Sequence, residues 1–160
     1  MPAKEHRYAV HLAWTGNLGE GTRRYGGYGR DHVISAAGKA AIAGSSDPAF
    51  RGDASRWNPE ELLVASISTC HQLWYLHLCA SAGLVVEGYE DDAVGVMVED
   101  ADGGGRFAKV TLRPKIVLAA GGDVANAAAL HHDAHDKCFV ANSVNFPVVV
   151  EPSFLVATSK

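Results

Sequence analysis

The order of strand-like and helical segments along the chain predicts an α+β protein. Strand-like segments precede one long helical segment, further strands follow it, and a second helix and a last strand complete the chain. Strands joined by short turns form antiparallel sheet, and helices grouped between strand pairs favour α+β over an alternating parallel fold. With 160 residues, the chain has the length of one domain, and we predict a single domain over residues 1–160.

Composition excludes several classes of protein. Hydrophobic residues make up 48% of the chain and charged residues 20%, as in ordinary soluble globular proteins. The net charge of −4, without a cluster of Lys or Arg, argues against a nucleic-acid partner. The polar N-terminus lacks the apolar region of a signal peptide, and no apolar run is long enough to span a membrane. We therefore expect a cytoplasmic protein.

The first third of the chain predicts a small sheet with long connections. Residues 7–14 fit a first strand, and the Gly-, Tyr- and Arg-rich residues 15–31 fit a turn or mobile loop. Residues 32–43 predict a hairpin that turns near Gly38. Residues 44–57 form a loop that leads into the central helix.

Residues 58–83 predict the central helix of the protein. Asn58 is a suitable N-cap, Pro59 occupies the first helical position, and Gly83 is a natural stop. Between these signals nearly every residue is apolar or small, so we expect the helix to be buried on most sides. Cys70 lies at its middle, and a thiol in such a position needs an explanation.

The second half of the chain predicts strands, a helix and a final strand. The expected elements are a strand at residues 84–100, its partner at 107–118, a helix from Asp123, a short helical piece at 139–145 and a strand at 147–156. A tight turn at residues 103–105 joins the two strands. The long helix ends near Cys138.

The chain has three cysteines, too few for a secreted disulfide scaffold. Cys79 follows Cys70 by nine residues and therefore points about 180° away around a helix. We interpret Cys79 as a buried bystander. Cys138 lies 68 residues beyond Cys70, so the sequence alone cannot make these two thiols neighbours.

A reactive cysteine needs nearby positive charge to favour its thiolate. Arg51 is the best candidate, because its loop runs into the central helix, and Arg56 is the second. Glu60 could hold the guanidinium in place. Glu60 and Cys70 are ten residues apart, which is about 15 Å along a helix. Either the first turn is distorted, or Glu60 and Arg51 reach Cys70 of another subunit; we favour the second, with the helix packed against its twin.

The run Asn58–Leu63, with Cys70 ten residues after Glu60, resembles the signature of the OsmC/Ohr family (osmotically inducible protein C and organic hydroperoxide resistance protein). An Ala- and His-rich helix that ends in Cys138, followed by Asn142 and Ser143, agrees with it. The resemblance covers roughly residues 7–157. It implies an intertwined homodimer in which antiparallel sheets wrap around two long central helices.

The resemblance also implies a function. Family members are thiol-dependent peroxidases that reduce organic hydroperoxides without a cofactor and are regenerated by dithiols such as lipoyl groups. Cys70 matches the peroxidatic cysteine of the family. Cys138 matches the resolving cysteine, which implies a Cys70–Cys138 disulfide. Glu60 matches the glutamate that holds an arginine. Phe139 stands where the family motif has proline. The arginine is not placed by motif alone: Arg51 fits one branch of the family, and others take it from an earlier segment, where Arg23 and Arg24 are candidates.

A second hypothesis is a non-catalytic dimer that binds a small ligand or a metal. His131, His135 and Cys138 recur at helical spacing on one face, which suits metal ligands. Histidines near a helix C-terminus also complement the helix dipole, and no second ligand cluster appears, so we expect no metal. His132 has no assigned role, and His71 points about 100° away from Cys70, so it is expected to be packed or solvated rather than a base. Trp57, Trp74 and Phe139 are the expected apolar neighbours of a peroxide.

Overall fold

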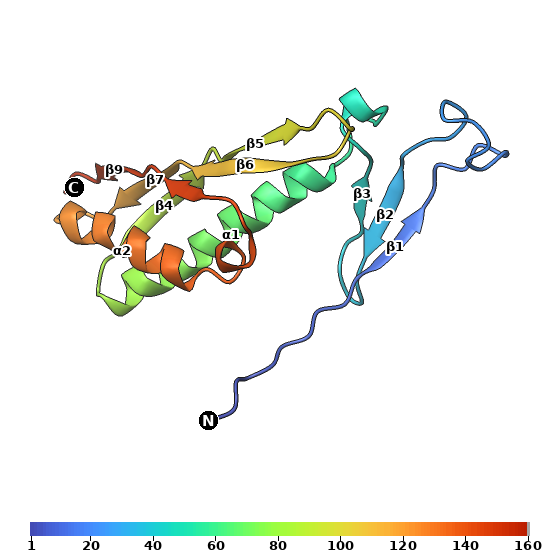
Figure 1. The fold of residues 1–160 in the computed structure, drawn as a ribbon. Coiled ribbons are helices and arrows are strands. Elements are labelled where there is room, and N and C mark those ends of the chain that lie inside the picture. Colours follow the sequence, from blue (N-terminus) through green and yellow to red (C-terminus); the bar gives the residue numbers. More distant parts are fainter. Residues whose placement is uncertain (160) are drawn as a thin grey trace. The chain divides into compact units, whose positions relative to one another are not determined.

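The computed structural model describes residues 1–159, which divide into two compact units, Met1–Leu62 and a second that begins at Leu63. Helices and strands occur together as an α+β protein (Figure 1). The prediction of fold class is confirmed. The prediction of one domain over residues 1–160 stays a prediction.

The first unit contains one antiparallel sheet in the order β1-β2-β3. Its strands are β1 (His11–Trp14), β2 (His32–Ser35) and β3 (Ile42–Gly44). The predicted hairpin is confirmed: Ile34 pairs with Ile42, and Gly38 makes the turn at a φ of +73° that favours glycine. Strand β1 is shorter than the predicted 7–14, and residues 15–31 form an irregular connection as expected.

Helix α1 (Pro59–Ser81) begins with the predicted cap. The Asn58 Oδ1 accepts from the amide of Glu61 at 2.8 Å, and the Glu61 carboxylate accepts from the amide of Asn58 at 3.2 Å. This reciprocal pair is a capping box. Gly83, at a φ of +73°, follows the end of the helix. The first turn is therefore regular.

Burial along α1 follows one stripe. The buried residues Ile67, His71, Tyr75 and Cys79 recur every four positions, which places them on one helical face. Leu73, on another face, is 65% exposed. The expectation of a helix buried on most sides holds only in part within a single chain: this stripe is fully buried, its flanks are partly buried, and Thr69, Leu73 and His77 are exposed.

The second unit contains two three-stranded sheets, ordered β4-β7-β9 and β5-β6-β8. The strands are β4 (Val86–Asp91), β5 (Val94–Glu99), β6 (Gly105–Leu112), β7 (Pro114–Leu118), β8 (Val148–Val150) and β9 (Ser153–Val156). Each predicted long strand is divided in two, and Pro114 and Pro152 mark two of the breaks because proline has no amide to donate. Strands β8 and β9 pair in parallel with β6 and β7, so the sheets are mixed rather than wholly antiparallel.

Helix α2 (Val124–Lys137) begins at Asp123, whose side chain accepts from the amide of Asn126. The short helix η2 (Ala141–Ser143) follows it, within the predicted residues 139–145. In Figure 1, α1 and α2 lie on one side of the strands of the second unit. A core of Tyr75, Cys79, Ile116 and Leu118 with alanines of α2 fills the space between them. No helix within residues 1–159 is long and apolar enough to cross a membrane.

Candidate active site

The fold brings Cys70 and Cys138 together, although 68 residues separate them in the sequence. Cys70 lies in the middle of α1, and Cys138 is the residue at which α2 ends. The two thiols are near enough to interact and are free rather than joined. Cys138 is fully buried, whereas Cys70 is half-buried. The two cysteines thus form a pair with one accessible and one covered sulfur.

The backbone after α2 donates to the covered sulfur. The amide of Ala141 lies 3.4 Å from the Cys138 Sγ and donates to it. Burial, and then the contact with Cys70, raise the pKa of Cys138 to about 11, although hydrogen bonds from the amides of Ala141 and Val140 favour the thiolate. Without these amide donors the pKa of Cys138 would be higher still.

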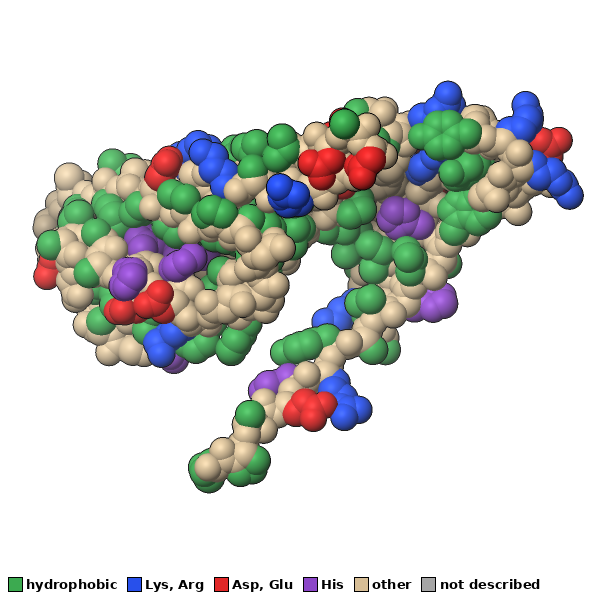
Figure 2. Space-filling view, viewed as in Figure 1, with side chains coloured by type: hydrophobic (Ala, Val, Ile, Leu, Met, Phe, Trp, Pro, Cys, Tyr) green, Lys and Arg blue, Asp and Glu red, His purple; other side chains and the backbone are tan. Residues whose placement is uncertain are grey.

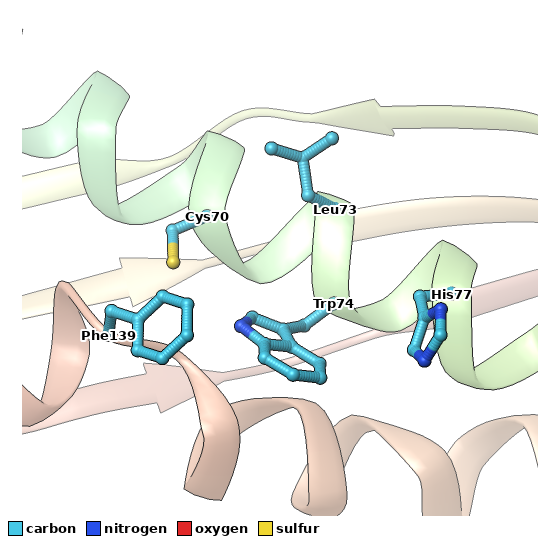
Figure 3. A pocket seen from close by; sticks show the side chains of 5 residues that line it. All are labelled: Cys70, Leu73, Trp74, His77 and Phe139. Atoms are coloured by element: carbon cyan, nitrogen blue, oxygen red, sulfur yellow. The ribbon is translucent and has the colours of Figure 1, made fainter. Parts of the chain in front are cut away.

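Cys70 opens into a pocket of about 300 Å³. The pocket is lined by Cys70, Leu73, Trp74, His77 and Phe139. Figure 3 shows the sulfur of Cys70 directed toward the Phe139 ring, with the Trp74 indole alongside. The Trp74 and Phe139 rings meet edge to face, with centroids 5.6 Å apart. An apolar organic group suits this pocket better than a small polar molecule.

The prediction that Trp74 and Phe139 lie beside Cys70 is confirmed. Trp57 belongs to the first unit, where its carbonyl accepts from the amide of Ser45. Cys79 is only 1% exposed and packs in the core against Tyr75, and its burial raises its pKa. The prediction that Cys79 is buried is confirmed, and its lack of a role in the chemistry stays a prediction.

Arg51 lies in the first unit, in a cluster that sequence reasoning only partly identified. Its backbone adopts the left-handed region, with a φ of 65°, alone among the non-glycine residues within 1–159. Its guanidinium carbon lies 5.1 Å from the centre of the Tyr25 ring. A Cβ on Gly26 would lie 3.1 Å from the Arg51 Nη1, so a glycine gives the guanidinium its room.

Arg30 contributes a second cation to the same cluster, and sequence reasoning missed it. Its guanidinium lies 4.8 Å from the centre of the Tyr25 ring and 3.8 Å from that of Tyr28. It also donates to the backbone carbonyls of both tyrosines. Within residues 1–159, neither Arg30 nor Arg51 forms an ion pair with a carboxylate. The alternation of tyrosine and glycine before Arg30 was the available signal.

The other candidate arginines have different environments. Arg56 pairs with Asp31 at 3.3 Å and donates to the carbonyl of His32, which ties the loop to the sheet. Arg24 pairs with Glu20 at 3.1 Å. Arg23 is exposed. Among these candidates Arg51 keeps a guanidinium that is held by an aromatic ring and not neutralised by a carboxylate.

Glu60 is half-buried in the first turn of α1. Because α1 is helical from Pro59, the ten residues from Glu60 to Cys70 correspond to about 15 Å of helix. The alternative of a distorted first turn is therefore wrong. Glu60 and Arg51 form no ion pair with each other within the described residues of the first unit. Their roles beside Cys70 stay predictions.

Two histidines form a buried pair between the helices. The Nε2 of His71 lies 2.9 Å from the Nδ1 of His131, and the His131 ring stacks on Tyr75 with centroids 3.8 Å apart. Burial lowers the pKa of His71 to about 4 and that of His131 to about 3. The His71 ring is packed, as expected, and its hydrogen-bonding partner is His131 rather than Cys70.

The side chains weighed as candidate metal ligands have other partners. His131 binds His71, and Cys138 contacts Cys70. Figure 2 shows histidine side chains on the face that carries α2, where exposed His132 lies 3.4 Å from the Asp136 carboxylate. Across the described 1–159, no three His, Cys, Asp or Glu side chains are grouped as metal ligands.

Comparison with protein families gives a match over residues 52–153, to the family described as OsmC-like protein. Among solved structures, an OsmC-like protein of unknown function from Vibrio cholerae is 30% identical, with a TM-score of 0.83 over 92% of this chain and 99% of that chain. No curated protein matches the chain.

More distant solved structures share the fold. An organic hydroperoxide resistance protein from Legionella pneumophila is 19% identical, with a TM-score of 0.67 over 94% of this chain and 98% of that chain. The organic hydroperoxide resistance protein OhrB of Bacillus subtilis is 20% identical, with a TM-score of 0.61 over 92% of this chain and 98% of that chain. At this level of identity the similarity concerns the fold alone.

Proposed function

The chain belongs to the OsmC-like family, and from this premise we propose that it is a thiol-dependent peroxidase that reduces organic hydroperoxides to alcohols. The observation that carries the proposal is the contact between two free thiols, one of which opens into an apolar pocket. A structural cysteine needs neither a thiol neighbour nor access to a pocket. Two relatives of the same fold are named for resistance to organic hydroperoxides, which supports this reaction class.

The reaction uses the two cysteines in sequence. The Cys70 thiolate attacks the terminal oxygen of ROOH, the O–O bond breaks, and a proton completes the alcohol ROH while Cys70 becomes a sulfenic acid. The Cys138 thiol then attacks the sulfenic sulfur, which forms the Cys70–Cys138 disulfide and releases water. An external dithiol of the lipoyl type then reduces the disulfide and is itself oxidised to a cyclic disulfide.

Burial of Cys138 fits the resolving role. A thiol with a raised pKa stays protonated until the sulfenic acid forms beside it, and it does not compete for the peroxide. Cys70 faces the pocket and is the sulfur that a hydroperoxide reaches. The aromatic walls of Trp74 and Phe139 favour peroxides with an apolar organic group.

In this proposal the arginine and the glutamate act across a homodimer. Arg51 places a positive charge beside the Cys70 thiolate and orients the peroxide, and Glu60 positions its guanidinium. Because about 15 Å of regular helix separates Glu60 from Cys70, each subunit contributes Arg51 and Glu60 to Cys70 of the partner subunit. The Arg51 guanidinium, supported by Tyr25 and not ion-paired within residues 1–159, is suited to this role.

Cumene hydroperoxide provides the test of the reaction. We expect one equivalent to convert the two free thiols of Cys70 and Cys138 into one disulfide, seen as a cross-linked peptide by mass spectrometry. Cys70→Ser abolishes turnover with a dithiol, and Cys138→Ser stops at the Cys70 sulfenic acid. Cys79→Ala is the matched control and retains turnover. Consumption of hydroperoxide by Cys70→Ser at the wild-type rate would contradict the mechanism.

Mixed dimers test the shared site. Cys70→Ser and Arg51→Gln subunits are each inactive, but a dimer that contains one of each retains one intact site if Arg51 acts across the interface. We expect activity to appear when the two variants are unfolded together and refolded as a mixture. The same mixture with Arg30→Gln in place of Arg51→Gln shows which arginine serves the thiol. No recovery with either arginine variant would contradict a site shared between subunits.

A second candidate function is the binding of a small apolar ligand without turnover. The pocket of about 300 Å³ favours it, because its size suits a small organic molecule whether or not Cys70 reacts. Cumyl alcohol, the product expected from cumene hydroperoxide, distinguishes the two functions. A ligand-binding protein binds the alcohol tightly and leaves its thiols reduced when the hydroperoxide is added.

A further inference from the structure

The two sulfurs of the cysteine pair differ in access and in hydrogen bonding, and this difference determines how a disulfide between them is opened. We propose that the reducing thiol attacks the sulfur of Cys70, and that Cys138 leaves as the thiolate. The proposal rests on the proposed function only in requiring that Cys70 and Cys138 form a disulfide.

Access decides which sulfur is attacked. A thiolate attacks a disulfide in line, from the side opposite the leaving sulfur, so the attacked sulfur needs an open far side. The side chain of Cys138 is 0% exposed, and the backbone of the turn at Ala141 lies against its sulfur. Cys70 lines the pocket of about 300 Å³, together with Trp74 and Phe139 (Figure 3). An external thiol therefore reaches Cys70 and not Cys138.

Access rather than acidity sets this direction, because burial raises the pKa of Cys138 and makes it the poorer leaving group, and its amide donor offsets this only in part. The amide of Ala141 donates to the Cys138 Sγ at 3.4 Å, and the nearby Val140 amide also favours the Cys138 thiolate. Among the hydrogen bonds within residues 1–159, no backbone amide donates to the Cys70 Sγ. Burial makes a thiolate at Cys138 costly, so these donors matter more there than they would at an exposed sulfur.

The exchange is balanced without any further reactant. The thiolate of a dithiol forms a bond to the Cys70 sulfur, the Cys70–Cys138 bond breaks, and its electron pair leaves with the Cys138 sulfur. The second thiol of the reductant then attacks its own mixed-disulfide sulfur, closes a cyclic disulfide and releases Cys70 as the thiolate. The two protons of the dithiol are available to Cys138 and to solvent. Two electrons pass from the dithiol to the cysteine pair.

This assignment has a kinetic consequence. Hydroperoxide and reductant both approach Cys70, so they use the same pocket at different stages of the cycle. A reductant with an apolar arm beside its thiol fits walls formed by Trp74 and Phe139 better than a charged thiol does. We expect ping-pong kinetics, with inhibition by an unreactive alcohol that is competitive toward each substrate when the other is saturating, and mixed when it is not.

The direct test uses a monothiol, because it cannot complete the second step. Diamide first oxidises the full-length protein to the disulfide, so that no peroxidase step is needed. A brief exposure to 2-mercaptoethanol is then stopped with mild acid, the protein is unfolded in guanidinium with excess N-ethylmaleimide, and the peptides are mapped by mass spectrometry. We expect mercaptoethanol on Cys70 and maleimide on Cys138. Mercaptoethanol on Cys138 in most molecules would overturn the proposal.

The same experiment separates this proposal from the proposed function. If diamide gives the predicted adducts but hydroperoxides leave the thiols reduced, the direction of opening stands and the peroxidase function fails. If hydroperoxides form the disulfide but the adduct lies on Cys138, the peroxidase function stands and this proposal fails. If neither oxidant joins Cys70 to Cys138, both are overturned.

A backbone variant tests the part played by the amide donor. Ala141→Pro removes the N–H that donates to Cys138 at the first residue of η2, and because Val140 before it is in the αR region that a following proline disfavours, the fold of this variant is checked first. We expect reduction of the disulfide to slow by roughly tenfold, the loss typical of one hydrogen bond to a charged group. Ala141→Gly keeps the N–H and should reduce at the wild-type rate. Equal rates for the two variants, both folded by circular dichroism, would remove the amide from the mechanism.

Discussion

The buried pair of His71 and His131 makes the fold sensitive to mild acid. Both rings are almost completely covered, and they share one hydrogen bond of 2.9 Å between α1 and α2. Burial is the main cause of the lowered pKa of each. His135 lowers the pKa of His71 further, and Asp91 acts in the opposite direction. The perturbation we consider is a fall in pH from 7 to 5.

The direction in which stability changes with pH follows from the number of protons that the folded and unfolded states bind. Above a pH of about 6.5 both histidines are neutral in the folded and unfolded states and give no pH dependence. Below it the unfolded chain takes up two protons that the folded chain does not, because the folded pKa values are about 4 for His71 and about 3 for His131. Stability is therefore lost progressively as the pH falls from 6.5 toward these values. At pH 5 each histidine costs about 2 kcal/mol, and the pair costs about 4 kcal/mol.

Guanidinium unfolding at pH 7, 6 and 5, at fixed protein concentration, measures this loss. We expect the free energy of unfolding of the wild type to fall by about 4 kcal/mol between pH 7 and 5, and that of His131→Gln by about half as much. His132→Gln is the matched control, because His132 is exposed on the same helix and should leave the slope unchanged. A wild-type change of less than about 1 kcal/mol, or equal slopes for the two variants, would refute the reasoning.

Other substitutions test the remaining features. Cys79→Ala should cost about 1 kcal/mol of stability, because it removes a sulfur buried against Tyr75, and should leave the rate of hydroperoxide-driven thiol loss unchanged; unfolding and thiol titration measure the two effects. Asn58→Ala removes the acceptor for the amide of Glu61 and should cost about 1 kcal/mol in chemical unfolding, whereas Asn58→Ser should cost little. Trp74→Ala should lower kcat/KM for cumene hydroperoxide by roughly tenfold and affect the smaller tert-butyl hydroperoxide less, and equal losses would argue against an aromatic wall.

Local chemistry made the elements of this protein predictable. The cap at Asn58, the stop at Gly83 and the turn at Gly38 depend on interactions within a few residues, so the sequence contains all of their causes. The fixed angle between Cys70 and Cys79 around one helix likewise separated the pocket thiol from the core thiol. The family signature from Asn58 to Cys70 added the reaction class.

Contacts between distant segments were decided only by the tertiary structure. Apart from the family resemblance, nothing in the sequence brought Cys138 to Cys70, because their contact depends on how α2 packs beside α1. Nor could it join His71 to His131, since the spacing on α2 is equally compatible with a metal site and with a buried pair. Arg30 escaped notice because its position on the Tyr25 ring depends on the path of an irregular loop.

The helix that contains Cys70 shows which features depend on local sequence and which depend on tertiary packing. Its residues alone determined where it starts and ends, and that its thiol lies ten residues beyond Glu60. Its apolar composition did not determine which faces are covered, because burial depends on the surfaces packed against each face. The tertiary structure buries one stripe fully and its flanks in part, leaves Leu73 exposed, and gives the sulfur of Cys70 both a partner and a pocket.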